Sequence, residues 1–135
     1  MAQIAVVPLV LKDVTLTLGT DTYEKHVSEV RFTPSASTIS WTGLGGNTVT
    51  DVSTATWTAT LGYVQDWETV DSLSQYLLAN EGESVAATFK PKSGSGPSFT
   101  ATLTVTPGAI GGAVNAYATT QVTLGSTKPV LVPAA

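Results

Sequence analysis

Apolar and polar residues alternate along several stretches of the chain, which is the pattern of strands buried on one face. The two most regular stretches run from Thr54 to Tyr63 and from Phe99 to Thr106, and threonine fills the polar positions in both. Threonine is β-branched and suits a pleated, half-exposed surface, so both stretches are predicted to be strands. Their threonines form two rows: Thr54, Thr56, Thr58 and Thr60 in the first, and Thr100, Thr102, Thr104 and Thr106 in the second.

Four further strands are predicted from the same alternation. They cover residues 14–18, 23–33, 85–89 and 116–124. Pro34 and the Ser-Ala-Ser that follows it are expected to end the second of these strands. Val122 and Leu124 are expected to face the core from the last one. About six strands in one chain of this length predict a single mainly β domain over residues 1–135.

One segment departs from the β pattern. Its apolar residues recur at helical spacing, at Val70, Leu73 and Leu77. This spacing predicts one short helix over residues 71–80 that lies against the sheet. Asp71 or Ser72 is expected to cap the start of that helix, and Gln75 stands three residues after Ser72 as in a capping box.

Three stretches rich in glycine or proline are predicted to connect the strands. Residues 40–53 carry several glycines and are expected to form a long loop or hairpin tip. Residues 92–97 are expected to form a flexible hairpin turn, and residues 107–114 to join the last two strands. The predicted fold is a β-sandwich or barrel of about six strands, with one short flanking helix and a long hairpin loop.

The chain has few charges for a free monomer. Charged residues make up 12% of it and hydrophobic residues 42%, with a mean hydropathy of +0.20. Composition alone favours the plainer interpretation, a small β protein with threonine and serine on its surface. The uncharged strands from Ala55 and Phe99 favour the alternative, because unprotected sheet edges pair with further strands. We therefore expect the strands of other copies to continue the sheet.

The charge balance and the missing cysteines exclude several classes of function. The net charge of −4 argues against a protein that grips nucleic acid, since phosphate binding needs Lys and Arg. Without cysteine there is no disulfide or thiolate metal site. The start has no basic region typical of a signal peptide, and the apolar run that Pro8 interrupts is too short to span a bilayer. Cytoplasmic synthesis without a membrane partner is expected.

No catalytic, cofactor or metal site is predicted. His26, the single histidine, is expected to be exposed or at an interface rather than catalytic. Asp66, Glu68 and Asp71 surround Trp67; paired carboxylates serve glycosidases, but their position favours contact with the N-terminal dipole of the predicted helix.

The aromatic and glycine-rich positions have structural interpretations as well. Trp57 shares its face with apolar residues and is expected in the core, whereas Trp41 is the tryptophan expected to be exposed. The Gly-Leu-Gly-Gly run at residues 43–46 is followed by neither a helix nor a lysine, so it is interpreted as a permissive tip rather than a phosphate loop.

A series of short motifs between Ala55 and Pro129 keeps a distinctive order and spacing. The series consists of WTATLGYVQDW at 57–67, SLSQYLLAN at 72–80, FKP at 89–91, FTATLTV at 99–105, Gly-Gly at 111–112, and VTLG at 122–125 before Lys128-Pro129. In this order the motifs resemble the major tail (tail tube) proteins of long-tailed, siphovirus-type bacteriophages. The resemblance covers a little over half of the chain.

The resemblance implies a tail-tube-like β-sandwich or barrel whose copies form hexameric rings that stack into a hollow tube. Inner strands would join between subunits, and the hairpin over residues 35–53 would serve ring stacking. The hairpin residues singled out are Trp41, Gly43, Leu44, Gly45, Gly46 and Asn47. Terminal arms at about 1–11 and 126–135 would contact neighbouring subunits through Ile4, Val6, Val7, Leu9, Val130, Leu131 and Val132.

The resemblance also implies a structural virion protein of the tail, with no enzymatic activity and no cofactor. Its expected partners are further copies and the tape measure, tail terminator and tail tip proteins, and double-stranded DNA would pass through without specific binding. We hypothesise that one of the two threonine rows lines the lumen, because an uncharged wall offers DNA neither cationic anchors nor stacking platforms.

Two other functions fit the same sequence. A capsid or tail decoration domain would share the composition but would stay a small oligomer in solution. A carbohydrate-binding adhesin module would expose Trp41 or Trp67 in a cleft for sugar stacking.

Overall fold

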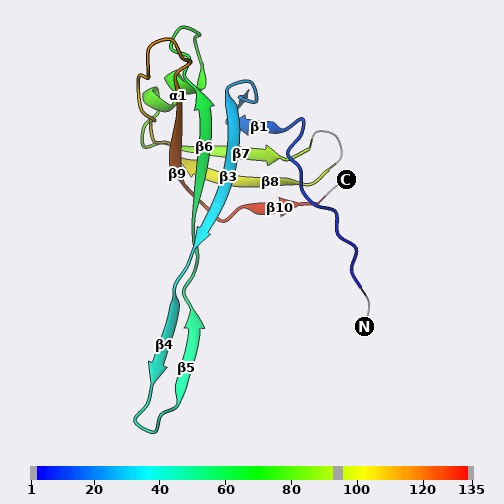
Figure 1. Ribbon diagram of the computed structural model, residues 1–135, viewed down its shortest axis with the longest axis vertical. Coiled ribbons are helices and arrows are strands. Elements are labelled where there is room, and N and C mark those ends of the chain that lie inside the picture. The colour runs from blue at the N-terminus through cyan, green and yellow to red at the C-terminus, as the bar shows by residue number, and fades with distance from the viewer. Residues whose placement is uncertain (1–2, 93–95, 134–135) are drawn as a thin grey trace.

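The computed structural model describes residues 3–92 and 96–133 of the 135-residue chain. Figure 1 shows a body of crossing strands with a helix at one end, and a long two-stranded ribbon that projects from the other end. The strands are β1 (Thr15–Leu18), β2 (Asp21–Thr22), β3 (Val27–Ser35), β4 (Thr38–Thr42), β5 (Thr48–Val52), β6 (Thr56–Val64), β7 (Ser84–Lys90), β8 (Ser98–Thr104), β9 (Thr119–Ser126) and β10 (Val130–Val132). The helix α1 (Leu73–Ala79) has seven residues, and no helix in the described ranges is long enough to cross a membrane.

The main sheet is antiparallel and runs in the order β2-β1-β7-β8-β9-β6-β3, with β10 paired to β8. It folds over between β8 and β9, which share only two residue pairs, so that one layer crosses the other (Figure 1). The rings of Phe32 on β3 and Phe89 on β7 lie 6.1 Å apart although these strands are not neighbours in the sheet. The two layers therefore pack face to face as a β-sandwich, and the sheet does not close into a barrel.

Alternate residues of both layers form one hydrophobic core between them. Leu61 of β6, Leu124 of β9 and Leu103 of β8 are almost fully buried, and Leu73 and Leu77 place one face of α1 against the same cluster. Val122 and Leu124 face inward as predicted. Burial of this apolar surface is the main favourable term in folding.

The mainly β sandwich with one short flanking helix confirms the predicted fold class. The described residues hold ten strands rather than about six, because part of the glycine-rich stretch forms β4 and β5, the C-terminal segment forms β10, and a two-residue β2 follows β1. The predicted turn at 92–97 falls partly on residues 93–95, which lie outside the described residues.

The strand predicted to end at Pro34 and the following Ser-Ala-Ser does end there, at Ser35, although Pro34 itself is still paired. Pro34 lies inside β3, opposite Trp57 of β6. Proline has no N–H to donate, and β3 tolerates it because this strand is the edge of the sheet and pairs on one side only. The predicted start of this strand at Tyr23 is too early, since β3 begins at Val27 and Tyr23 belongs to the preceding turn.

The helix forms where predicted but starts later, at Leu73, because Asp71 takes a positive φ of 65° that a helix cannot use. Ser72 caps the helix: its Oγ accepts a hydrogen bond from the Gln75 N–H at 3.4 Å. The reciprocal half of the predicted capping box is not formed, since the Gln75 side chain instead donates to the Trp67 carbonyl at 2.6 Å.

Replacing Ser72 with Ala should lower the free energy of unfolding by about 1 kcal/mol, the usual cost of losing an N-cap. The hydroxyl also donates to the carbonyl of Asp66, so the loss leaves two backbone groups without this partner. Urea unfolding measures the difference, with Ser84→Ala at the exposed start of β7 as the control. An unchanged midpoint for Ser72→Ala would show that the cap contributes nothing.

Candidate assembly surfaces

The ribbon of β4 and β5 extends away from the body as an ordered hairpin (Figure 1). Its residues are all exposed, and both strands pair only with each other. Backbone and hydroxyl hydrogen bonds between Ser37 and Ser53 join the strands at the base, and the Thr42 and Thr48 hydroxyls lie 3.3 Å apart near the tip. A two-stranded hairpin of this kind is marginally stable on its own in water.

The two faces of the ribbon differ in chemistry. Residues directly opposite each other in an antiparallel pair share a face. Trp41 lies opposite Val49 and Ile39 lies opposite Asp51, so one face is largely apolar. Ser40 lies opposite Thr50 on the other face. Since Trp41 remains 64% exposed, the apolar face has no cover within the described chain.

The tip of the ribbon presents one large apolar side chain to solvent. Gly43 donates to the Asn47 carbonyl at 2.8 Å and Gly46 donates back to Gly43 at 3.0 Å, which closes the turn. Gly46 takes a φ of 86°, which requires glycine or strains another residue. The ring of Trp41 lies over Gly43, where an added Cβ would meet it at 3.1 Å. Leu44 is fully exposed at the end of the turn.

The N-terminal segment is a second exposed apolar surface. Residues 3–11 form no strand or helix and run away from the body (Figure 1). Ile4 is 93% exposed, and Val6, Val7 and Leu9 are exposed as well. The C-terminal segment differs from this arm, because Val130–Val132 pair with β8 of the same chain while their side chains stay largely exposed.

The two predicted threonine rows lie on the outer faces of different layers. Alternate residues of β6 point into the core, which leaves Thr56, Thr58 and Thr60 on the outside of one layer. Thr100, Thr102 and Thr104 lie outside β8 in the other layer. The predicted ends of the rows, Thr54 and Thr106, are exposed and flank the strands.

The surroundings of the two rows differ in charge. On the β6 side, Arg31 of β3 lies opposite Thr60, and Glu29 lies opposite Gly62 with its carboxylate accepting from Gln121 at 3.1 Å. On the β8 side, the neighbours directly opposite Thr102 and Thr104 are Ala86, Ser84 and Gly125. The face around the β8 row is thus the less charged of the two.

The acidic group around Trp67 shapes the chain before the helix. The Asp66 carboxylate accepts hydrogen bonds from the N–H groups of Glu68 and Thr69 at 3.0 and 3.1 Å. Hydrogen bonds from the Thr69 side chain and from these N–H groups hold the pKa of Asp66 below its ordinary value. The expected contact with the helix dipole is not what organises this carboxylate, since the first turn of α1 holds no acidic residue. Trp67 donates to the Gln65 side chain at 3.1 Å.

His26 is less exposed than expected. Its Nδ1 is buried and has no hydrogen-bond partner among the described residues, and its ring meets the ring of Tyr23 edge-on at 5.8 Å. Burial, followed by the nearby Asp21 carboxylate, raises the pKa of Tyr23 to about 12. The described residues contain no cluster of three His, Cys, Asp or Glu that could hold a metal ion.

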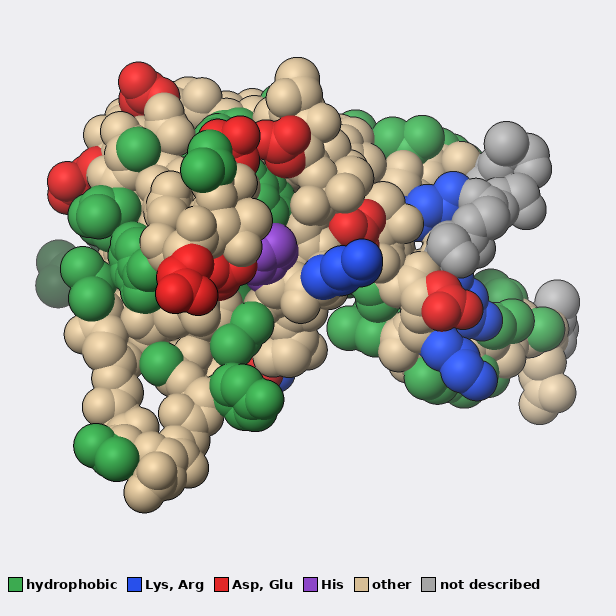
Figure 2. Space-filling model, turned by 90° about the horizontal axis from the view of Figure 1, so that it is seen from above, with side chains coloured by type: hydrophobic (Ala, Val, Ile, Leu, Met, Phe, Trp, Pro, Cys, Tyr) green, Lys and Arg blue, Asp and Glu red, His purple; other side chains and the backbone are tan. Residues whose placement is uncertain are grey.

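Side-chain charges do not gather into a binding surface at the end of the body shown in Figure 2. Acidic side chains lie at several separate places there, and the described part of this face shows no broad basic patch. The apolar ribbon face, the N-terminal arm and the threonine-rich outer faces are the candidate assembly surfaces of the described chain.

No family model matches the chain, and no curated protein matches its sequence. Several solved chains share its fold, and two of them are the following. One is a chain of the PVC sheath-tube complex in the extended state, from an extracellular contractile injection system, with a TM-score of 0.68, 15% identity, and coverage of 93% of this chain and 92% of that chain. The other is a chain of the PVC sheath/tube terminator in the extended state, with a TM-score of 0.64, 14% identity, and coverage of 96% and 99%.

At this level of identity the two matches show the fold. They confirm the tail-tube-like fold expected from the sequence, without singling out the siphovirus type. Trp41 is exposed as predicted, whereas the exposed Ile39 and Val49 on the same face of the ribbon were not predicted. The alternation of Ile39-Ser40-Trp41-Thr42 and Thr48-Val49-Thr50 was the available signal, and the glycines between these short stretches masked it.

Proposed function

We propose that the chain is a structural subunit of a tail tube, in a phage tail or a related injection apparatus. The observation that carries this proposal is the fold match to a chain of a sheath-tube complex and to a chain of a sheath/tube terminator. Each match covers more than nine-tenths of this chain and of the matched chain. A fold alone does not fix a function. The exposed apolar ribbon face and arm support self-assembly independently, because large uncovered apolar patches mark interaction surfaces.

In the proposed assembly, copies form rings, six to a ring, that stack into a hollow tube. The apolar face of the ribbon and Leu44 dock on the next ring, and the terminal segments contact neighbours within a ring. The outer face of β8, with Thr100, Thr102 and Thr104, lines the lumen, since it is the less charged threonine face. Head-to-tail contacts of this kind close into rings when the rotation permits.

The proposed role is structural and needs neither a catalytic site nor a cofactor. The subunit is made in the host cytoplasm and becomes part of the virion tail. Double-stranded DNA passes through the lumen during ejection without specific binding, and the tape measure, tail terminator and tail tip proteins are the other partners.

Negative-stain electron microscopy of the purified full chain tests the proposal. Hollow rods or stacked rings are expected, and monodisperse monomers at every concentration would contradict it. A subunit-resolved map of the same rods tests the lumen assignment, with the β8 threonines facing the channel as the expected result. If both threonine rows pack against protein, that assignment is wrong.

A further inference from the structure

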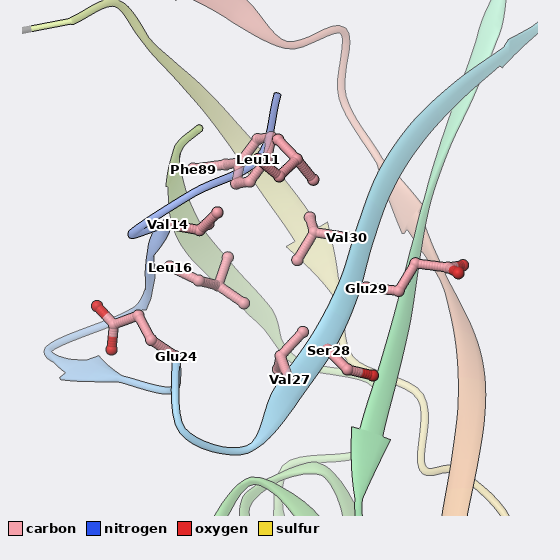
Figure 3. A pocket seen from close by; sticks show the side chains of 9 residues that line it. All are labelled: Leu11, Val14, Leu16, Glu24, Val27, Ser28, Glu29, Val30 and Phe89. Carbon is pink, nitrogen blue, oxygen red and sulfur yellow. The ribbon is translucent and has the colours of Figure 1, made fainter. Parts of the chain in front are cut away.

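A hollow opens along the unpaired edge of β3. The sheet ends at β3 on one side and at β1 and β2 on the other, and no strand within the described chain pairs with the outer edge of β3. Between these two edges lies a cavity of about 190 Å³ lined by Leu16 of β1 and Val14 just before it, Val27 and Val30 of β3, and Leu11 of the arm. Figure 3 shows these side chains pointing toward one another across the gap, while Glu29 points away.

A second hollow lies further toward the ribbon, between β3 and β6 of one layer and β8 and β10 of the other. Its volume is about 300 Å³, and its walls include Phe32 of β3, Trp57 of β6 and Leu131 of β10. Phe89 lines both hollows, and Val30 and Phe32 are alternate residues on the inner face of β3. The two hollows share the Phe89 wall and are together called the edge groove here; the first of them lies beside the free edge of β3.

The edge groove has the two features that bind an extended apolar strand. The free edge of β3 offers unpaired backbone N–H and C=O groups, and the walls offer pockets for alternate side chains, as in β-strand addition. The walls named above are apolar; Glu24, Ser28 and Glu29 also line the first hollow, and Lys128 lines the second. A strand without charges is therefore the chemistry that the groove accepts at lowest desolvation cost.

The chain carries one segment with this chemistry. Residues 4–10 read Ile-Ala-Val-Val-Pro-Leu-Val, contain no charge, and are exposed and outside any element. At about 3.3 Å per residue the segment reaches about 23 Å when extended. Proline at position 8 suits an edge strand, because its missing N–H can face away from β3.

The direction of the arm selects a second copy over the arm's own chain. The Lys12 N–H donates a backbone hydrogen bond to the Pro91 carbonyl at 3.4 Å, which holds the base of the arm. Leu11 lines the first of the two hollows. From there the arm runs away from the body (Figure 1), and Ile4, Val6 and Val7 stay exposed, so the arm leaves the groove of its own chain uncovered.

We propose that residues 4–10 of the N-terminal arm of one copy add as a strand to the free edge of β3 in the next copy and fill the edge groove of that copy. The inference builds on the proposed self-assembly and specifies which surfaces meet within a ring. The contact is head-to-tail, since arm and groove are different surfaces, and it repeats around a closed ring. It buries the arm and the open edge of the sandwich in one step.

A cysteine pair tests the proposal, since the chain has no cysteine of its own. Val30→Cys is combined in turn with Ala5→Cys, Val7→Cys or Leu9→Cys, three arm positions that share a face with Leu11 by the two-residue period. The assembled protein is oxidised and run on a denaturing, non-reducing gel. A ladder of covalent multimers is expected from at least one pair, because a disulfide forms only when the Cα atoms come within about 7 Å.

Two other outcomes overturn the proposal. A chain-internal disulfide, seen as a faster-running monomer, would place the arm in its own groove, and no bond from any pair in assembled material would place it elsewhere. Val114→Cys, at an exposed apolar loop position, replaces the arm cysteine as the matched control and should give no ladder with Val30→Cys. Thermal unfolding of the reduced variants checks that each remains folded.

A charge variant keeps the proposal testable if the cysteine variants misfold. Val6→Glu with Val7→Glu should raise the concentration needed for assembly at least about tenfold, whereas Val114→Glu should leave it unchanged. Equal effects of both variants would contradict the arm contact. Failure of the two proposals is distinguishable: rods without a ladder overturn the arm contact alone, and a ladder without rods overturns the tube alone.

Discussion

Asp at both Trp41 and Val49 is expected to abolish the stacking of rings while leaving the body folded. These side chains lie opposite each other on the apolar face of the ribbon and remain largely exposed in the single chain. Two carboxylates there would have to be buried without partners when the face docks, at a cost of several kcal/mol. Electron microscopy should show single rings or free subunits in place of rods, and the thermal midpoint of the body should stay within about 2 °C of the parent.

The opposite face of the ribbon supplies the matched control. Ser40→Asp with Thr50→Asp places the same two charges directly opposite each other on the same strands, but on the polar face. Repulsion between the two new charges weakens the ribbon in both variants. Rods should persist in this control. If both variants stop stacking alike, the stability of the ribbon rather than its apolar face is responsible, and if neither does, the ribbon is not the stacking surface.

Leu124→Ala is expected to lower the free energy of unfolding by about 3 kcal/mol or more. Leu124 is 0% exposed on β9 and belongs to the single core that both layers share, so its loss leaves a cavity that the crossing strands cannot easily fill. A domain of this size is stabilised by only about 5–15 kcal/mol in total. Urea unfolding of the soluble protein measures the change.

The neighbouring residue provides the comparison for the core variant. Thr123→Ala removes an outward, exposed side chain from the same strand and should change the free energy of unfolding by less than about 0.5 kcal/mol. A similar loss in both variants would mean that strand propensity, rather than core packing, sets the stability of β9. A loss below about 1 kcal/mol for Leu124→Ala would contradict the role given to the shared core.

The fold was predictable where one face of a strand meets a single core. Alternation at Ala59 and Leu61, and at Val122 and Leu124, located β6 and β9 to within a few residues, because burial on one side imposes a two-residue period. Tyr23 was placed in a strand, but it reaches the core from a turn at 2% exposure, where no period applies.

The surfaces were less predictable than the core, for a physical reason. β4 and β5 bury nothing in their own chain, so no core requires their side chains to alternate between apolar and polar. The pattern that could predict them is limited to five residues on each side of the glycine-rich tip. The pairing of Val130–Val132 with β8 depends on the fold-over of the sheet, which no local pattern encodes. The edge groove likewise arises from strands far apart in sequence.

The exposed ribbon has a consequence for the kinetics with which the proposed polymer grows. Because its strands contact only each other, the ordering of the ribbon is weakly supported in a free subunit and becomes fully supported only against a neighbour. The first contacts between two free subunits must then offset the loss of conformational entropy in two ribbons. A subunit that joins the end of an existing polymer loses this entropy in one ribbon only. If the chain forms the proposed tube, such a polymer would nucleate slowly and elongate quickly, and a template rather than chance encounters in solution would set where each tube starts.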